Sequence, residues 1–280
     1  MFYTIEKQIW QEKLNSNKIK NNSFSRAMKH KKYIFDIGAF DGMTGLSLAI
    51  ENPKYMVHAF EANKYLIKEI FNNKKKLEKF FNYKIKNYKF HNFAISNKNS
   101  ISTFNIAKNP TVSSLNRFSK NIDKTWPGWR ETHCHFIKKI RVKTIRLENF
   151  CKKNSIETID YLHVDTQGSD LKVLQGLGSY ITKVNSGVIE TAINKKKALY
   201  SNNHTLKEVK KFFKKNKIKI LKKENPINLD NEINVYFEKL NFKLKKPKTT
   251  FNLRYYNRII QNRSTLKDRF KKLLDKLRNI

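Results

Sequence analysis

Short apolar runs alternate with amphipathic segments along most of this chain. The runs, such as Tyr33–Ile37, are rich in branched and aromatic residues and are typical of strands buried on both faces. The segments between them, such as Lys64–Phe81, carry apolar residues every three or four positions and are typical of helices packed on one face. Because strand and helix alternate, the pattern predicts an α/β fold with a doubly wound, mostly parallel, seven-stranded sheet and helices on both faces.

Turn residues set the expected limits of these elements. Asn52-Pro53 ends the first helix, since a residue before proline avoids the helical conformation, and Gly178 ends a later one. The expected strands are Tyr33–Ile37, Tyr55–Phe60, Tyr88–Ser96, Thr158–Val164, Ser186–Ile193, Ile218–Leu221 and Glu232–Glu238. The expected helices are Thr44–Asn52, Lys64–Phe81, Leu147–Lys153, Asp170–Gly178 and Leu206–Lys215.

The alternation is interrupted at about residues 101–145. Ile101–Ile106 and Lys139–Ile145 alternate like the two strands of a pair, and a long loop joins them. Loops of this length in compact domains are often lids or binding loops. We therefore expect this insertion to recognise a substrate, with four candidate residues in the loop: Ser113, Ser114, Trp126 and Trp129.

The two ends of the chain differ in composition from its middle. Residues 1–31 are expected to form a polar helical extension, and residues 32–240 one domain. Residues 241–280 carry 13 Lys or Arg and 2 Asp, and Ser264 could begin a basic amphipathic helix. Such a tail could fold back on its domain, contact a partner or a second copy of the chain, or lie on a membrane or nucleic acid.

Composition limits the compartment and the partners. Only two cysteines, no apolar run of about eighteen residues and no signal-peptide pattern favour a cytoplasmic protein without a membrane span. The 59 basic and 23 acidic side chains give a formal charge of +36. This surplus is compatible with an anionic partner such as nucleic acid, anionic lipid or phosphorylated glycan, or with an AT-rich coding bias laid over an ordinary fold.

The first predicted strand ends in an acid and two glycines. Asp36 is followed by Gly38 and Gly42, and a helix begins directly after them. A glycine turn between strand and helix lets a backbone approach a nucleotide-like cofactor at an electropositive helix end. The spacing lacks the middle glycine of a dinucleotide fingerprint, which argues against a nicotinamide oxidoreductase. It resembles the first motif of class I S-adenosylmethionine-dependent methyltransferases.

A second cofactor signal follows at the end of the next strand. Glu61 lies 19 residues beyond Gly42, close to the interval at which a βαβ unit presents an acid to a ribose. The same acid could instead cap the following helix. If both signals are correct, the cofactor lies at the carboxyl ends of the strands, where Gly38, Glu61, Ser96 and Asp165 fall together.

The ordered set of motifs over roughly residues 33–238 resembles the FkbM-type methyltransferase family. The first motif is Asp36-Ile-Gly-Ala-Phe-Asp-Gly42, with Phe40 where the family usually has Asn, and Ala59-Phe-Glu-Ala62 and Phe93-Ala-Ile-Ser-Asn97 follow it. The most specific motif is Ile159-Asp-Tyr-Leu-His-Val-Asp-Thr-Gln-Gly-Ser-Asp-Leu-Lys-Val-Leu-Gln-Gly176. There His163 replaces the usual Lys, and Asp170 the usual Glu.

The resemblance implies a Rossmann-like methyltransferase that uses S-adenosylmethionine and O-methylates a sugar, a glycan or a small metabolite. It implies cofactor contacts from Asp36, Gly38, Ala39, Phe40, Asp41, Gly42, Glu61, Ala62, Ala94, Ile95, Ser96 and Asp165. Asp165 is the first candidate for the base, although it could instead cap a helix or bind the methionine amino group. His163 is the second, or it orients Asp165. Gln167, Asp170 and Glu190 are further candidates for acceptor binding.

Two other functions stay open at this point. A nucleic-acid methyltransferase would account for the charge, and Trp126, Trp129 and Arg130 offer some interleaved aromatic and basic residues. A binding module that kept the fold and lost catalysis is the other, although the intact glycine turn and Glu61 argue against it. No metal site is expected, because His133, Cys134 and His135 are adjacent and cannot all face one ion in an extended segment.

Overall fold

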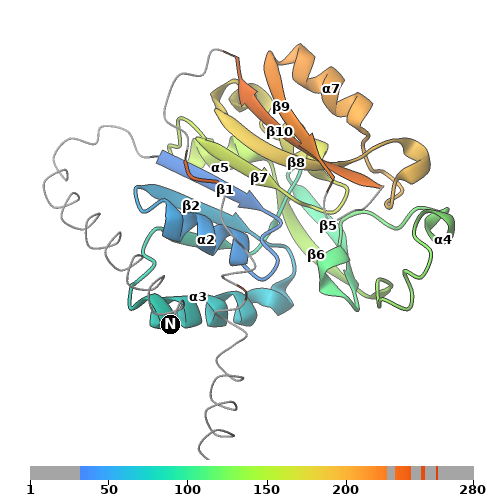
Figure 1. Cartoon of the computed structure of the whole chain (residues 1–280), viewed down its shortest axis with the longest axis horizontal. Coiled ribbons are helices and arrows are strands. Elements are labelled where there is room, and N and C mark those ends of the chain that lie inside the picture. The colour runs from blue at the N-terminus through green and yellow to red at the C-terminus, as the bar shows by residue number, and fades with distance from the viewer. Residues whose placement is uncertain (1–31, 226–230, 241–246, 250–256, 258–280) are drawn as a thin grey trace, which may run out of the picture.

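The computed structural model describes residues 32–225, 231–240, 247–249 and 257. Its main sheet has seven strands in the order β3-β2-β1-β7-β8-β10-β9 (Figure 1). The strands are β1 Lys32–Ile37, β2 Tyr55–Phe60, β3 Tyr88–His91, β7 Tyr161–Val164, β8 Ser186–Ala192, β9 Ile218–Glu224 and β10 Glu232–Lys239. β10 runs in the direction opposite to the other six strands, which are parallel to one another. The predicted seven-stranded, mostly parallel sheet is therefore confirmed.

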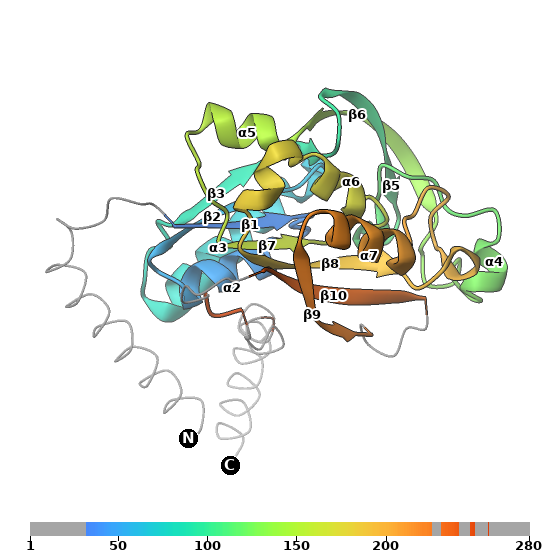
Figure 2. The same ribbon diagram turned by 90° about the horizontal axis from the view of Figure 1, so that it is seen from above.

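Helices cover both faces of this sheet because its central strands are apolar on both sides. Ile34 and Phe35 of β1 point to opposite faces, and both are fully buried. On the Ile34 side lie α2 Met43–Glu51 and, after the short turn η1 Lys64–Leu66, α3 Ile67–Phe81. On the Phe35 side lie α5 Leu147–Lys153, α6 Asp170–Gln175 and α7 Leu206–Lys215 (Figure 2). All five helices were predicted.

One predicted strand is wrong in its extent. The segment expected as a single strand from Tyr88 to Ser96 is broken after His91, and its second part, β4 Ala94–Ile95, joins a different sheet. This sheet has the order β4-β6-β5, with β5 Ser100–Ala107 antiparallel to β6 Phe136–Ile145. The small sheet lies beyond the carboxyl ends of the main strands (Figure 1).

The loop between β5 and β6 packs around its own aromatic cluster. It contains η2 Pro110–Val112 and α4 Ile122–Thr125, which the sequence pattern did not predict. Phe118 stacks on Phe136 with ring centroids 4.1 Å apart and on Tyr200 at 5.4 Å. Because Tyr200 follows β8, this cluster fastens the insertion to the main domain.

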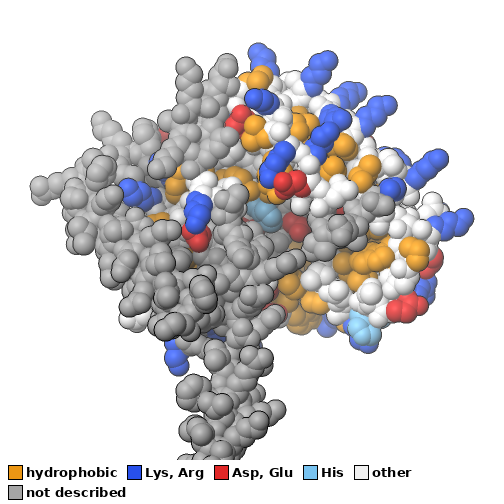
Figure 3. All heavy atoms as spheres, viewed as in Figure 1, with side chains coloured by type: hydrophobic (Ala, Val, Ile, Leu, Met, Phe, Trp, Pro, Cys, Tyr) orange, Lys and Arg blue, Asp and Glu red, His pale blue; other side chains and the backbone are white. Residues whose placement is uncertain are grey.

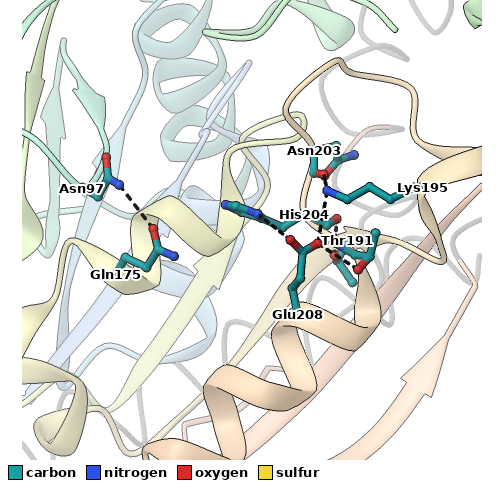
Figure 4. Close-up of polar contacts among 8 residues, drawn as sticks. Asn97, Gln175, Thr191, Lys195, Asn203, His204 and Glu208 are labelled. Carbon is teal, nitrogen blue, oxygen red and sulfur yellow. Dashed lines mark hydrogen bonds and ion pairs between the residues drawn. The ribbon is translucent and has the colours of Figure 1, made fainter.

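Polar contacts fasten two further connections (Figure 4). Between β8 and α7, the ammonium of Lys195 in η4 Lys195–Lys197 donates to the carbonyl of Asn203 at 3.0 Å and pairs with Glu208 at 3.3 Å. After β4, the amide of Asn97 donates to Gln175 at the end of α6 at 3.2 Å. The remaining short turn, η3 Gly178–Lys183, follows α6 directly.

Part of the chain beyond β10 contacts α2. Asn52, just after α2, donates to the carbonyl of Lys248 at 2.8 Å and accepts from its backbone N–H at 2.6 Å. The predicted polar extension of residues 1–31 and the amphipathic helix from Ser264 lie outside the described residues. Among the residues described, no helix is long and apolar enough to cross a membrane.

Candidate active site

A pocket of about 810 Å³, open solvent at its mouth included, lies where β1, β2 and β7 end. Three layers form its walls: the turns after these strands, the small sheet, and the start of the insertion loop. Its lining residues are Ile37, Gly38, Phe40, Phe60, Glu61, Ala62, Phe93, Ala94, Ile95, Phe104, Pro110, Thr111, Ser113, Leu115, Asp165, Thr166 and Gln167.

The turn after β1 brings two backbones unusually close together. Gly38 has a φ of +84°, and a Cβ atom there would lie 1.7 Å from the carbonyl oxygen of Asp165. The N–H groups of Gly38 and Ala39 both donate to the carbonyl of Phe60 at 2.9 Å. Glycine is therefore required at position 38, because any side chain would push apart the turns after β1 and β7.

Glu61 is held at the end of β2 by backbone donors. Its carboxylate accepts from the N–H of Phe40 at 2.8 Å and from that of Asn63 at 2.7 Å. The first contact requires Phe40 to adopt a φ of +50°, a conformation in which Asn is less strained than Phe. Burial raises the pKa of Glu61 from 4.5 to about 7, although these donors oppose the shift.

Aromatic and aliphatic side chains form the wall beside Glu61. Phe60 and Phe93 are in contact, with ring centroids 5.6 Å apart, and Ala94 and Ile95 of β4 extend this wall toward Phe104 of β5. An apolar slot next to a buried carboxylate suits a flat heterocycle joined to a hydroxylated ring.

Asp165 faces the same pocket from the turn after β7. Its carboxylate accepts from the side-chain amide of Gln167 at 2.7 Å. Gln167 and Gly168 have φ values of +55° and +91°, and the turn continues into Ser169 and α6. This tight turn leaves the Asp165 side chain at the pocket wall, where a carboxylate can accept a proton from a bound hydroxyl.

Asp36 and His163 form a pair below the pocket and do not line it. Asp36 is completely buried, and its Oδ1 lies 2.8 Å from Nδ1 of His163 on the neighbouring strand. Burial lowers the pKa of His163, but the hydrogen bond to Asp36 and the nearby carboxylates raise it more, so that the net pKa lies above 6.5. The pair therefore favours a protonated imidazole.

Further carboxyl groups crowd around Asp165. Burial and then the charge of Asp165 raise the pKa of Asp170 to about 7 and that of Glu232 to about 8. Burial, followed by Asp165 and Glu232, also raises the pKa of Glu190. This end of the site consequently favours a cationic ligand group, which would relieve the repulsion.

The structure brings about half of the sequence-predicted residues to the pocket. Those that line it are Gly38, Phe40, Glu61, Ala62, Ala94, Ile95, Ser113, Asp165 and Gln167. The others lie outside the lining: Asp36, Ala39, Asp41, Gly42, Ser96, Ser114, Trp126, Trp129, His163, Asp170 and Glu190. Several of these have contacts that build the fold, such as Trp129, which packs under the insertion and donates to Asp123 at 2.7 Å.

Several lining residues were not singled out from the sequence. They are Ile37, Phe60, Phe93, Phe104, Pro110, Thr111, Leu115 and Thr166. Pro110, Thr111 and Leu115 are close in sequence to the candidates Ser113 and Ser114, and Phe93 begins the motif that contains Ala94 and Ile95, so these four could have been included. Phe104 gives no such signal, because a phenylalanine in a strand is equally typical of the core.

Comparisons with known proteins agree with this architecture. The model of the methyltransferase FkbM domain matches residues 36–244. Methyltransferase FkbM from Methylobacillus flagellatus KT is 14% identical, with a TM-score of 0.40 over 74% of this chain and 44% of that chain. This chain thus spans less than half the length of that relative.

Two other solved structures are similar at the same level. M. capricolum TrmK, solved with S-adenosyl-homocysteine, is 14% identical with a TM-score of 0.41 over 93% of this chain and 87% of that one. Magnesium protoporphyrin IX methyltransferase from Synechocystis PCC 6803, solved with bound SAM, is 9% identical with a TM-score of 0.39 over 82% and 79%. No curated protein matches. Because the family model covers most of the chain, the protein belongs to the FkbM methyltransferase domain family.

Proposed function

We propose that this protein transfers a methyl group from S-adenosylmethionine to a hydroxyl of a sugar, a glycan or a small metabolite. The observation that carries the proposal is that Gly38, Glu61 and Asp165 face one pocket at the ends of three adjacent strands. Family membership supports methyl transfer, and this arrangement supports the donor and the type of acceptor.

The residues present fit the methyl donor. Glu61 would accept hydrogen bonds from the ribose hydroxyls, and the wall of Phe60, Phe93 and Ile95 would contact the adenine. The carboxyl groups around Asp165 complement a positively charged ligand. When bound, the donor supplies an activated methyl group on a sulfonium, so that the protein need only place the acceptor and remove its proton.

Asp165 would remove that proton. It is the carboxylate of this cluster that reaches the pocket wall, whereas His163 is paired with Asp36 beneath it. Asp165 would accept the hydroxyl proton as the acceptor oxygen forms its bond to the methyl carbon. A protonated His163 would stabilise the ionised form of Asp165 before the reaction.

Calorimetry tests the donor. S-Adenosylmethionine should bind, NAD(P) should not, and Glu61→Ala should weaken S-adenosylmethionine binding by about tenfold or more. The control is Glu157→Ala, an exposed carboxyl remote from the pocket lining. Failure of the wild-type chain to bind S-adenosylmethionine at millimolar concentration would overturn the proposal.

Activity tests the acceptor class. Transfer of a labelled methyl group into hydroxylated sugars, glycans and metabolites should be lost in Asp165→Asn while donor binding is retained. If label enters only amino groups, or if Asp165→Asn is fully active, the proposed acceptor or the proposed base is wrong.

A nucleic-acid acceptor is the second candidate, and the distribution of lysines favours it. Along α7, the lysines at 207, 210, 211, 214 and 215 recur on one exposed stripe, and none pairs with a described carboxylate. A groove of about 1020 Å³ nearby is lined by Lys124, Lys196 and Lys197. Figure 3 shows Lys and Arg side chains gathered along the edge that α7 occupies.

RNA binding over a salt series separates this candidate from the first. Phosphate contacts should make the affinity fall steeply with salt, and replacing Lys124, Lys196 and Lys197 by Ser should flatten the slope. Salt-independent or undetectable binding would leave the hydroxylated small molecule or glycan as the acceptor.

A further inference from the structure

A chain of hydrogen bonds leads from the pocket into the buried insertion. The side-chain amide of Gln167 donates to Asp165 Oδ1 at 2.7 Å, and the hydroxyl of Tyr200 donates to Gln167 Oε1 at 2.9 Å. The same hydroxyl lies 3.0 Å from the carbonyl oxygen of Val112. Tyr200 is only 1% exposed, so packing fixes its position.

The backbone of the turn fixes Gln167 between its two neighbours. The hydroxyl of Ser114 donates to the carbonyl of Gln167 at 2.6 Å. A Cβ atom at Gly168 would lie 2.9 Å from the ring of Tyr200, so the missing side chain lets this ring contact the turn. Gln167 can therefore rotate its amide group without moving its backbone.

Donors and acceptors do not balance while Asp165 is ionised. The Gln167 amide must then present nitrogen to Asp165 and oxygen to Tyr200. The Tyr200 hydroxyl has one hydrogen and two acceptors within 3.0 Å, Gln167 Oε1 and the Val112 carbonyl. The hydroxyl can donate its hydrogen to only one of these two acceptors at a time.

Donors and acceptors balance when Asp165 carries a proton. Half a turn of the Gln167 amide exchanges its oxygen and nitrogen at the same two positions. Asp165 then donates to Gln167 Oε1, Gln167 Nε2 donates to the Tyr200 hydroxyl, and Tyr200 donates to Val112. Each hydrogen has one acceptor, so the same atoms accommodate both protonation states.

We propose that Gln167 and Tyr200 are positioning residues that hold Asp165 in place both before and after it accepts a proton. The proposal rests on the proposed function, in which Asp165 takes the hydroxyl proton of the acceptor. In that step the oxygen takes up the methyl group with its own electron pair, and the donor sulfur keeps the pair of the broken carbon–sulfur bond. Rotation of the Gln167 amide accompanies the arrival of the proton.

Other ionisable groups lie close to Asp165. They are His163 of β7, Asp170 of α6, Glu190 of β8, Glu232 of β10, and Tyr200. Changes at Gln167 or Tyr200 leave the first four in place. Differences between variants therefore report on the hydrogen bonds of the chain.

The test needs neither donor nor acceptor. Asp165, labelled at ¹³Cγ and assigned through Asp165→Asn, and the ¹⁵N amide of Gln167, assigned through Gln167→Met, are followed by NMR in the full-length protein. Over about pH 4 to 9 the two signals should change with one common midpoint. A common midpoint is expected because a proton on Oδ1, the oxygen that faces Gln167, requires the amide to turn its own oxygen toward Asp165.

The two variants should affect the Asp165 midpoint differently. Tyr200→Phe removes one hydrogen bond from the ionised state and two from the protonated state, so the midpoint should fall by about half a pH unit. Gln167→Met removes one charge-assisted hydrogen bond from the ionised state and two neutral ones from the protonated state, so these losses should largely cancel and the midpoint should move by less than in Tyr200→Phe. Tyr180→Phe and Gln175→Met are matched controls outside the pocket lining and should leave it unchanged.

Separate midpoints for the two signals, or an unchanged midpoint in Tyr200→Phe, would overturn the proposal. If Tyr200→Phe does not fold, the common midpoint of the two wild-type signals decides. Failure of the proposed function appears elsewhere, as missing donor binding or methyl transfer, and leaves these titrations readable.

Discussion

At the scale of single residues, Glu61 links ligand binding to pH. Burial raises its pKa from 4.5 to about 7. A carboxyl whose pKa is higher in the folded chain stabilises the fold fully below about pH 4.5, and that contribution is lost as the pH rises through 7. Ribose hydroxyls, in contrast, would bind the ionised form. The folded chain thus favours the protonated form of Glu61, whereas the proposed ligand favours its ionised form.

Donor affinity should therefore fall as the solution becomes more acidic. Between pH 8 and 6 the ionised fraction of Glu61 decreases about tenfold, and the Kd for S-adenosylmethionine should rise about tenfold in the wild type. Calorimetry of Glu61→Gln should give weaker binding with a shallower pH dependence, because only the groups common to both proteins, such as Asp170 and Glu232, still titrate in this range. Titration of the ligand itself is common to both proteins, so equal slopes would contradict the assignment of the ribose to Glu61.

Gly38 offers a sharper test of the turn. Gly38→Ala should lower the free energy of unfolding by about 3 kcal/mol or more, because the new Cβ would meet the backbone of Asp165. Gly128→Ala is the control: its φ is also positive, at +78°, but its Cβ would meet only a side-chain oxygen 3.8 Å away. It should cost about 1 kcal/mol. Equal losses in urea denaturation would mean that the close approach does not matter.

Residues at fixed intervals could be predicted from the sequence, and residues that reach the pocket through tertiary packing could not. Gly38, Glu61 and Asp165 each follow a recognisable apolar strand, and parallel strands bring their carboxyl ends together. Tyr200 reaches the site through a loop whose path no local pattern fixes. For Asp36, the sequence places it beside the cofactor motif, but only the structure shows that it is paired with His163.

At the scale of elements, the predicted strand Tyr88–Ser96 is wrong because this segment contributes residues to two different sheets. Tyr88 to Ser96 looks like one strand because apolar and aromatic residues recur along its whole length. The amide of Asn92 instead donates to the carbonyl of Glu61 at 2.8 Å, and the chain then turns to pair β4 with β6. Local propensity contains no information about this change of partner.

The insertion is attached to the turn after β7 through Ser114. This residue is fully buried, donates to the Gln167 carbonyl at 2.6 Å, and accepts from the N–H of Asn116 at 2.9 Å. Ser114→Ala should lower the free energy of unfolding by about 2 kcal/mol, because it leaves buried groups without partners. Ser119→Ala removes one long contact at an exposed position and should have little effect. Equal denaturation midpoints for the two variants would contradict this attachment.

At the scale of the whole molecule, Lys248, which lies beyond β10, contacts the domain. The side-chain amide of Asn52 makes two hydrogen bonds with the backbone of Lys248, and the Lys248 ammonium pairs with Glu51. The expected domain limit at residue 240 therefore marks a change in composition. Among the described residues, contacts with the domain continue to at least Lys248. This contact is what we would expect if the tail folds back on its own domain, the first of the three roles considered above.

A thermodynamic cycle measures this contact. Asn52→Ala should cost about 2 kcal/mol in the full chain and clearly less in a chain that ends at Leu240, where its partner is missing. The difference is the coupling energy between Asn52 and the removed segment. Equal costs in both backgrounds would show that the contact contributes nothing to stability.

The placement of β4 has a consequence for how two ligands would affect each other. Ala94 and Ile95 line the pocket and are also hydrogen-bonded to β6, which is continuous with the insertion. An acceptor that draws the insertion inward would therefore press Ala94 and Ile95 against the bound nucleoside. Binding free energies are reciprocal, so the donor and the acceptor would each raise the affinity of the other by the same factor. The order in which the two ligands bind and the release of the products would then depend on β4.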